Sequence, residues 1–281
     1  MLFVRERQAV RNATRAIREL MLRPGREHAG GGVASGLSAM ATLALGPLRQ
    51  LPDIAVRVPG TLRDLGERVT SIPGGRRRAP DLAFAAQVLA GSVRQGAIMR
   101  ERYLNLLAAA MDSDTAARVH PAFLAVLRQL VPDEVRIISQ FQHDGPYPLL
   151  SVVARYRFGA PIGTELRSFS LLGDRAGCEH LDRVALYIDN LCRLGLAELR
   201  PVRVADDTRI FHALEAHPTV KAAIGRIEGG QSPLEGPAPE AAEGDDGEDR
   251  VIAEIQRKAL YVTAFGRQFY EACEYRPDPT R

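Results

Sequence analysis

The sequence predicts a mainly α-helical protein, with a helical N-terminal region and a winged-helix-like C-terminal half that carries a small β wing. First, apolar residues recur every three or four positions through most of the 281 residues, which is the period of an amphipathic helix. Second, only short runs, at residues 147–158, 199–204 and 259–263, are rich in β-formers. Third, a helix that ends in Arg-Leu-Gly-Leu at 193–196 is followed by two such runs and a last helix, which is the order of a winged helix.

The composition is that of a globular protein with one large domain or two modest ones. Hydrophobic residues make up 46% and charged residues 25% of the chain, enough to bury a core. The net charge of +3 comes almost entirely from arginine, since Lys221 and Lys258 are the only lysines, and we attribute it to compositional bias rather than to phosphate recognition. The three cysteines lack Cys-x-x-Cys spacing and suit reduced thiols in a cytoplasmic protein. We expect no signal peptide and no membrane-spanning helix.

Two expected N-terminal helices leave a membrane function open. Residues 4–22 predict a basic amphipathic helix, which would dock its apolar stripe on the body or lie on an anionic membrane. Residues 33–48 predict a helix of small apolar residues, which is a thin buried helix in water or a close-packing helix in a bilayer. Its shortness favours water. Peripheral contact with the inner membrane therefore stays an alternative to a plain cytoplasmic location.

The middle of the chain predicts helices separated by prolines and short polar turns. Residues 61–70 form the first of them, and the arginine run at 76–78 is expected to be an exposed loop. Pro80–Asp81 then opens one long helix, or two with a bend near Gly96, which gives way around Asp112.

The stretch from Arg102 to Glu134 is the most distinctive in the chain. An apolar helix leads to a polar turn, a His-Pro pair and a second apolar helix that ends at Pro-Asp-Glu. Helix punctuation explains this order, because Pro suits a first helical turn and acidic side chains favour a helix N-terminus. The same residues would alternatively form a binding surface, or set His120 as a general base beside Asp112. The candidate binding residues are Asn105, Met111, Asp112, His120, Pro121, Phe123, Gln129, Pro132, Asp133 and Glu134.

This stretch resembles the Abi-alpha (abortive infection alpha) family of bacteria. The resemblance begins near Leu43–Leu48, passes through Ser71–Pro73, is densest from Tyr103 to Glu134 and returns at Val262–Cys273. It implies a bacterial protein linked to phage defence. It supplies no established reaction.

The second half of the chain is predicted to contain the winged-helix-like part. A strand at 147–158 precedes a helix at 178–194, which Gly195 ends. The runs at 199–204 and 259–263 would pair as the wing, and residues 266–275 form the last helix. The helix at 178–194 mixes acidic and basic residues, whereas a helix that reads a DNA groove is markedly basic. We therefore expect a scaffold or protein-binding role, with at most non-specific nucleic-acid contact.

Residues 205–258 would enlarge the wing loop. They contain a helix at 211–227, broken at Pro218, and an acidic insertion at 228–249. The insertion is rich in Gly, Pro and Glu and is predicted to be disordered. Two regions result: residues 1–75, helical and flexible, and residues 76–281, the family-like core.

No catalytic or cofactor-binding motif is recognisable. No Gly-rich phosphate loop precedes a helix, no His-Glu-x-x-His pair is present, and Cys178 lies in no nucleophile elbow. We therefore expect a non-enzymatic protein that needs no cofactor or metal. It would act in abortive infection as an interaction or sensor module that binds a phage or host protein through Arg102–Glu134. The alternative is a membrane-perturbing effector that uses the two N-terminal helices.

Overall fold

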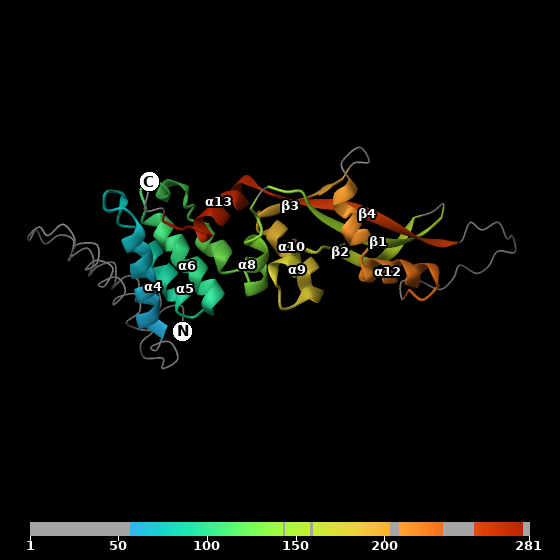
Figure 1. Ribbon diagram of the computed structural model, residues 1–281, viewed down its shortest axis with the longest axis horizontal. Coiled ribbons are helices and arrows are strands. Elements are labelled where there is room, and N and C mark those ends of the chain that lie inside the picture. The colour runs from blue at the N-terminus through green and yellow to red at the C-terminus, as the bar shows by residue number, and fades with distance from the viewer. Residues whose placement is uncertain (1–56, 143, 158–159, 203–207, 233–249, 278–281) are drawn as a thin grey trace, which may run out of the picture. The chain divides into compact units, whose positions relative to one another are not determined.

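The computed structural model of the chain describes residues 57–142, 144–157, 160–202, 208–232 and 250–277 (Figure 1). Helices predominate among these residues, with one small four-stranded antiparallel sheet, in agreement with the predicted mainly α-helical class. The predicted helices at 4–22 and 33–48 lie outside the described residues. None of the helices in the described ranges combines the length and the apolarity that crossing a bilayer requires.

The chain divides into two compact units, Met1–Val135 with Gln268–Arg281, and Arg136–Arg267. The boundary that the sequence suggests between residues 75 and 76 falls inside the first unit. The reason is that α4 (Arg57–Ser71) packs along α6 (Ala97–Ala110), so both helices belong to one body.

The first unit consists of helices that begin and end at polar residues, Gly and Pro. Asp81 caps α5 (Leu82–Ser92) by accepting a 2.8 Å hydrogen bond from the Phe84 amide. Gly96 precedes α6, so the predicted long helix is two helices with the break near that glycine. Its other elements are η2 (Gly74–Arg76), η3 (Ala116–Arg118) and α7 (Phe123–Leu127), while α8 (Pro132–Ile138) and α13 (Ala264–Cys273) run from one unit into the other.

Apolar side chains at helical spacing form the core of the first unit. The stripe predicted after the His-Pro pair is buried in full: Phe123, Val126, Leu127 and Leu130. Phe123 meets Phe269 of α13 edge-on, with ring centroids 5.5 Å apart. The segment that returns at residue 268 therefore completes a core that the N-terminal part begins.

The second unit holds the sheet, whose strand order is β2-β1-β4-β3 with all neighbours antiparallel. The strands are β1 (Tyr147–Tyr156), β2 (Pro161–Phe169), β3 (Ala197–Pro201) and β4 (Val251–Val262). The predicted pairing of residues 199–204 with residues 259–263 is present as β3 with β4, but β4 starts earlier than predicted and also pairs with the whole of β1. The sequence does not predict β2, because Pro161 and Gly163 are poor β-formers. In the structure, register shifts also interrupt the pairing of β2 with β1.

Helices α11 and α12 pack against one face of this sheet. The unit contains α9 (Leu172–Ala176), η4 (Leu181–Arg183), α10 (Val184–Arg193), η5 (Thr208–Phe211), α11 (His212–Glu215) and α12 (Pro218–Glu228). Leu150, Val152 and Ala154 of β1 pack in one buried cluster with side chains of α11 and α12, and Figure 1 shows α12 alongside the sheet. The predicted break at Pro218 is confirmed, with proline as the first residue of α12.

The helix predicted at 178–194 starts late and ends as predicted. Gly177, with a φ of 66°, ends α9, and the regular helix α10 begins only at Val184 after a 3₁₀ turn. Gly195 has a φ of 73°, and the Leu196 N–H donates to the Leu191 carbonyl over 3.0 Å. This is the glycine-ended helix terminus that the sequence indicates.

The start of the predicted acidic insertion is packed. α12 continues to Glu228, and Ser232, which is 6% exposed, donates a 2.7 Å hydrogen bond from Oγ to Glu165 Oε2. Disorder is therefore wrong for residues 228–232, because Glu165 provides a partner on β2 that the local composition does not reveal. Residues 233–249 lie outside the described residues.

Gly266 is expected to be intolerant of a side chain. A Cβ there would lie 1.9 Å from the Leu196 carbonyl oxygen and 2.7 Å from its carbon, both backbone atoms. Thr263 holds this approach, because its Oγ1 accepts from the Gly266 N–H at 2.9 Å and donates to the Gly195 carbonyl at 2.6 Å. Gly266→Ala should lower the unfolding free energy by about 1–3 kcal/mol or more, through overpacking.

Gly225 provides the matched control in the same unit. It lies inside α12, and a Cβ at this position would have no atom within 4 Å, so Gly225→Ala should stabilise by about 0.5–1 kcal/mol. Chemical denaturation of both variants decides the matter. Equal effects of the two substitutions would contradict the close approach of Gly266 to Leu196.

Candidate functional site

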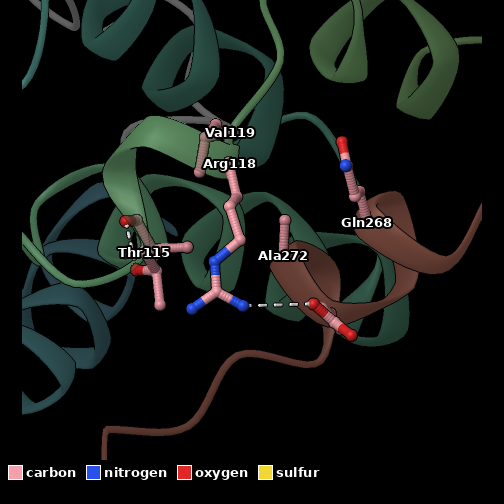
Figure 2. A pocket seen from close by; sticks show the side chains of 7 residues that line it. Thr115, Arg118, Val119, Gln268 and Ala272 are labelled. Carbon is pink, nitrogen blue, oxygen red and sulfur yellow. Dashed lines mark hydrogen bonds and ion pairs between the residues drawn. The ribbon is translucent and has the colours of Figure 1, made fainter. Parts of the chain in front are cut away.

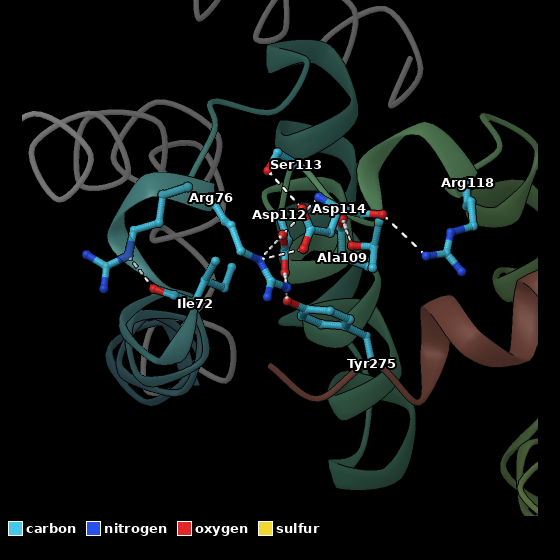
Figure 3. A network of polar contacts seen from close by, with 10 residues as sticks. Ile72, Arg76, Ala109, Asp112, Ser113, Asp114, Arg118 and Tyr275 are labelled. Atoms are coloured by element: carbon cyan, nitrogen blue, oxygen red, sulfur yellow. Dashed lines mark hydrogen bonds and ion pairs between the residues drawn. The ribbon is translucent and has the colours of Figure 1, made fainter. Parts of the chain in front are cut away.

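A buried carboxylate joins three separate segments of the first unit. Asp112 is fully buried, and both of its oxygens accept hydrogen bonds. Arg76 reaches Oδ1 with Nε at 3.0 Å and Oδ2 with Nη2 at 2.5 Å, and the Tyr275 hydroxyl donates to Oδ2 at 2.5 Å (Figure 3). The Asp114 amide fills the remaining place on Oδ1 at 3.0 Å. We call Arg76, Asp112 and Tyr275 the Asp112 clamp.

The local backbone explains how Arg76 reaches this carboxylate. Residues 76–78 run antiparallel to residues 111–113, with hydrogen bonds from the Arg78 amide to Met111 O and from the Ser113 amide to Arg76 O, both of 2.9 Å. This short ladder turns the guanidinium inward, and only 19% of the Arg76 side chain is exposed. The prediction of an exposed arginine loop is therefore wrong for Arg76.

The electrostatics fix the protonation state of all three groups. Burial alone would raise the pKa of Asp112, but the hydrogen bonds from Arg76, Tyr275 and the Asp114 amide outweigh it and hold that pKa below its ordinary value. The bond to Asp112 raises the pKa of Arg76, while burial and the same carboxylate raise the pKa of Tyr275. Near neutral pH the clamp is thus a carboxylate, a guanidinium and a neutral phenol, and none of them exchanges protons readily.

Two side chains of α6 bind the residues that precede Tyr275. Asn105, 4% exposed, donates from Nδ2 to the Cys273 carbonyl at 2.8 Å and accepts at Oδ1 from Arg68 Nε at 2.8 Å. Arg102 pairs with Glu274 at 2.9 Å. Residues 273, 274 and 275 are thus each bound by a residue of α6 or of the turn that follows it.

The structure separates the ten candidate residues by burial. Six are buried: Asn105, Met111, Asp112, Phe123, Asp133 and Glu134. Four are exposed: His120, Pro121, Gln129 and Pro132. Glu134 acts in helix capping, since its Oε2 accepts from the Val131 amide at 2.8 Å.

His120 lies at the entry of α7, as helix punctuation predicts. Its Nδ1 accepts a 3.1 Å hydrogen bond from the Ala122 amide, and its ring lies 5.9 Å from that of Phe123. The general-base hypothesis for His120 requires Asp112 to orient the imidazole. Asp112 has two donors on each oxygen and no place left for that role.

An open groove of about 500 Å³ lies beside the clamp in the first unit. Its wall includes three arginines and three carboxylates, so it presents no net charge to select an anion or a cation. A smaller pocket nearby measures about 20 Å³, the space of a single water molecule. Figure 2 shows Arg118 at this pocket, and its Nη1 lies 3.6 Å from Glu271 Oε2.

Two of the three cysteines, Cys192 and Cys273, are poorly suited to nucleophilic chemistry. Burial raises the pKa of the Cys273 thiol far above its usual range. Burial, helped by Asp189 and Glu198, raises the pKa of Cys192 to about 11. Both thiols therefore stay protonated near neutral pH, where a thiolate would be the reactive form. Within the described ranges, no three His, Cys, Asp or Glu residues gather as a metal site.

Sequence reasoning identified Asp112 and Asn105 but missed their partners. Arg76 stands in an arginine run with the composition of an exposed turn, and Tyr275 lies 163 residues from Asp112. The local sequence carries no indication of which residue such a distant tyrosine meets. The one feature of the sequence that could have indicated a role for the C-terminal segment was the return of the family resemblance at Val262–Cys273.

These features define a mostly helical protein whose first unit is closed by its own C-terminal segment around a buried carboxylate. The chain belongs to the abortive infection alpha family, whose sequence profile matches residues 55–273. No curated protein matches it. An uncharacterized protein from the hydrocarbon-degrading marine bacterium Alcanivorax borkumensis SK2 is 18% identical and aligns over 64% of this chain and 99% of its own, with a TM-score of 0.32. A TM-score that low supports no argument about this chain.

Removing the Tyr275 hydroxyl should weaken the clamp without altering packing. Tyr275→Phe takes one donor from a buried carboxylate and is expected to cost about 1.5–3 kcal/mol, as for hydrogen bonds to charged groups. Tyr261→Phe is the control, because the Tyr261 hydroxyl has no hydrogen-bond partner among the described residues. Urea unfolding measures both. A Tyr275→Phe variant as stable as Tyr261→Phe would contradict the clamp.

The stability difference between wild type and Tyr275→Phe should depend on pH. The folded pKa of Asp112 lies below the value of about 3.9 expected in the unfolded chain, so the clamp stabilises fully above that pH. The contribution is lost as pH falls through the folded pKa. The difference should thus be constant from about pH 5 to 8 and shrink below about pH 4. Unfolding at a series of pH values tests this, and a difference that grows on acidification would reverse the assigned sign.

Proposed function

We propose that the chain acts in abortive infection as a non-enzymatic module that binds a phage or host protein. Membership of the abortive infection alpha family supports the link to phage defence. The observation that supports the proposed mechanism most directly is that the Arg102–Glu134 stretch is divided into buried and exposed residues. Its buried residues build the clamp and the core, and its exposed residues from His120 to Pro132 form an outer surface on which Arg128 is the one Asp, Glu, Lys or Arg side chain.

That surface follows α7 and the start of α8. Exposed residues recur at helical spacing, at 121, 125, 128–129 and 132, beside Val131, which is 45% exposed. We call residues 121, 125, 128, 129, 131 and 132 the α7–α8 surface. Arg128 is its only charged side chain, so it lacks the arginine or lysine cluster that phosphate contact requires. A surface of Pro, Ala, Val and Gln suits a protein partner better.

The second unit supports the same class of function. A helix pair, α9 and α10, precedes the antiparallel strands β3 and β4, and β4 also pairs with β1; this order supports the winged-helix-like part that we propose. The arginines near α10 are already engaged: Arg167 with Asp189 at 2.8 Å and Arg193 with Asn190 at 2.9 Å. Phosphates would have to displace these partners. We therefore assign the winged-helix-like part a protein-binding or scaffold role, with weak and sequence-independent DNA contact.

The proposal is tested by phage plating alongside thermal melting. Val131→Asp should abolish protection with little change in melting temperature, because it places a charge on an exposed interaction surface. Phe123→Ala should also lose protection, but through a stability loss of about 3–5 kcal/mol. His120→Asn should stay folded and protective, because asparagine also accepts from the Ala122 amide.

Ala222→Asp is the control, since Ala222 is an exposed alanine on α12 in the other unit. It introduces the same charge away from the α7–α8 surface and should protect normally. Full protection by Val131→Asp would remove this surface from the mechanism. A folded but wholly inactive His120→Asn would instead point to chemistry at the imidazole.

A further inference from the structure

The outer face of α10 is an exposed helix face with an apolar centre. Val184, Tyr187, Ile188 and Leu191 point into the second unit and are buried. Leu186 lies on the opposite side and is 63% exposed, the most exposed of the large apolar side chains in the described ranges. Residues 189, 190 and 193 share its face at α-helical spacing, and residues 182 and 183 lie in the 3₁₀ turn η4 that leads into α10.

The residues around Leu186 are charged but balanced within one subunit. Arg183 lies 3.9 Å from Asp182, and Arg167 of β2 lies 2.8 Å from Asp189. An apolar centre inside a polar rim is the anatomy of a protein interface. Because positive and negative side chains balance on this face, a strongly charged partner such as nucleic acid is disfavoured. A partner surface that also carries both acidic and basic side chains is favoured.

A second copy of α10 carries acidic and basic residues in an order that complements the first copy. When two α10 helices pack antiparallel about a two-fold axis at Leu186, residues equally far before and after Leu186 face each other. Arg183 then faces Asp189 of the second copy, three positions to either side, and the symmetry repeats this pair. Asp182 faces Asn190 in the same way, while Leu186 meets its own equivalent. Parallel packing would set Asp189 against Asp189 and Arg183 against Arg183.

We infer that the chain self-associates through the outer face of α10, as an antiparallel two-fold pair centred on Leu186. The interface is isologous, so every favourable contact occurs twice. The helix has 10 residues and is about 15 Å long, which is short of the roughly 800 Å² per partner found in stable complexes. The dimer is therefore weak and concentration-dependent. This surface is separate in sequence from the α7–α8 surface and does not depend on the function proposed for it.

Sedimentation velocity of the full-length chain over a wide concentration range tests the inference. Wild type should shift from monomer toward dimer as concentration rises. Leu186→Glu should remain monomeric throughout, with unchanged circular dichroism, because the side chain is exposed. Ala222→Glu, which adds the same charge at an exposed residue of α12, should dimerise as wild type does.

Charge reversal tests the antiparallel register itself. Arg183→Asp and Asp189→Arg should each weaken the dimer at least tenfold, since each puts like charges opposite one another twice. The double variant restores opposite charges across the axis and should recover most of the wild-type affinity. All three are made with Arg167→Gln, so that Asp189→Arg meets no repulsion within its own subunit. Lys221→Asp on α12 controls for net charge.

Four results would overturn the inference. The first is a wild type that stays monomeric at the highest concentration, and the second is a Leu186→Glu variant that dimerises normally. The third is a double charge variant no better than the weaker single one. Sequence-specific retention of a DNA duplex that is lost in Leu186→Glu would assign this face to nucleic acid and also refute the inference.

Discussion

The first unit depends on one buried carboxylate. Asp112 is removed from water, and its charge is tolerable only because Arg76, Tyr275 and the Asp114 amide surround it with donors. Loss of one donor leaves part of that charge uncompensated, so the cost of breaking the clamp exceeds the strength of a single hydrogen bond. The clamp also joins residues 163 positions apart. Closing such a long loop costs conformational entropy, which the clamp, the Asn105 contact and the Phe123–Phe269 pair together offset.

This arrangement explains why the second unit can occupy the middle of the chain. The first unit is interrupted after Val135 and resumes at Gln268. Its integrity requires only that residues 268–275 return to α6, where Asn105 and Asp112 hold them. The second unit has a buried cluster around Leu150 and Phe211 whose members all lie within that unit. Long insertions within the second unit, such as the acidic segment, add little to the closure cost because that cost grows slowly with loop length.

The sequence predicts the parts of this fold that local rules determine. Helical periodicity locates α4 to α7, α12 and α13, and glycine conformation predicts the end of α10 at Gly195. The packed start of the acidic segment and the inward turn of Arg76 depend on distant partners, Glu165 and Asp112, that no local pattern reveals. β2 is missed for a related reason, since it is an edge strand that its neighbour β1 stabilises and its own sequence does not favour.

The candidate site shows the same division, with a consequence for function. The family-like stretch is most distinctive where side chains are buried, at Asn105, Asp112 and Phe123, and those positions are occupied by structural contacts. A buried carboxylate with two donors on each oxygen has no capacity left for a ligand. The residues that remain available to a partner are the exposed ones between them, which local sequence rules treat as ordinary surface. Within the family-like stretch, substitutions at buried residues therefore act first through stability, whereas a substitution at the exposed Val131 tests the proposed interaction with less disturbance of the core.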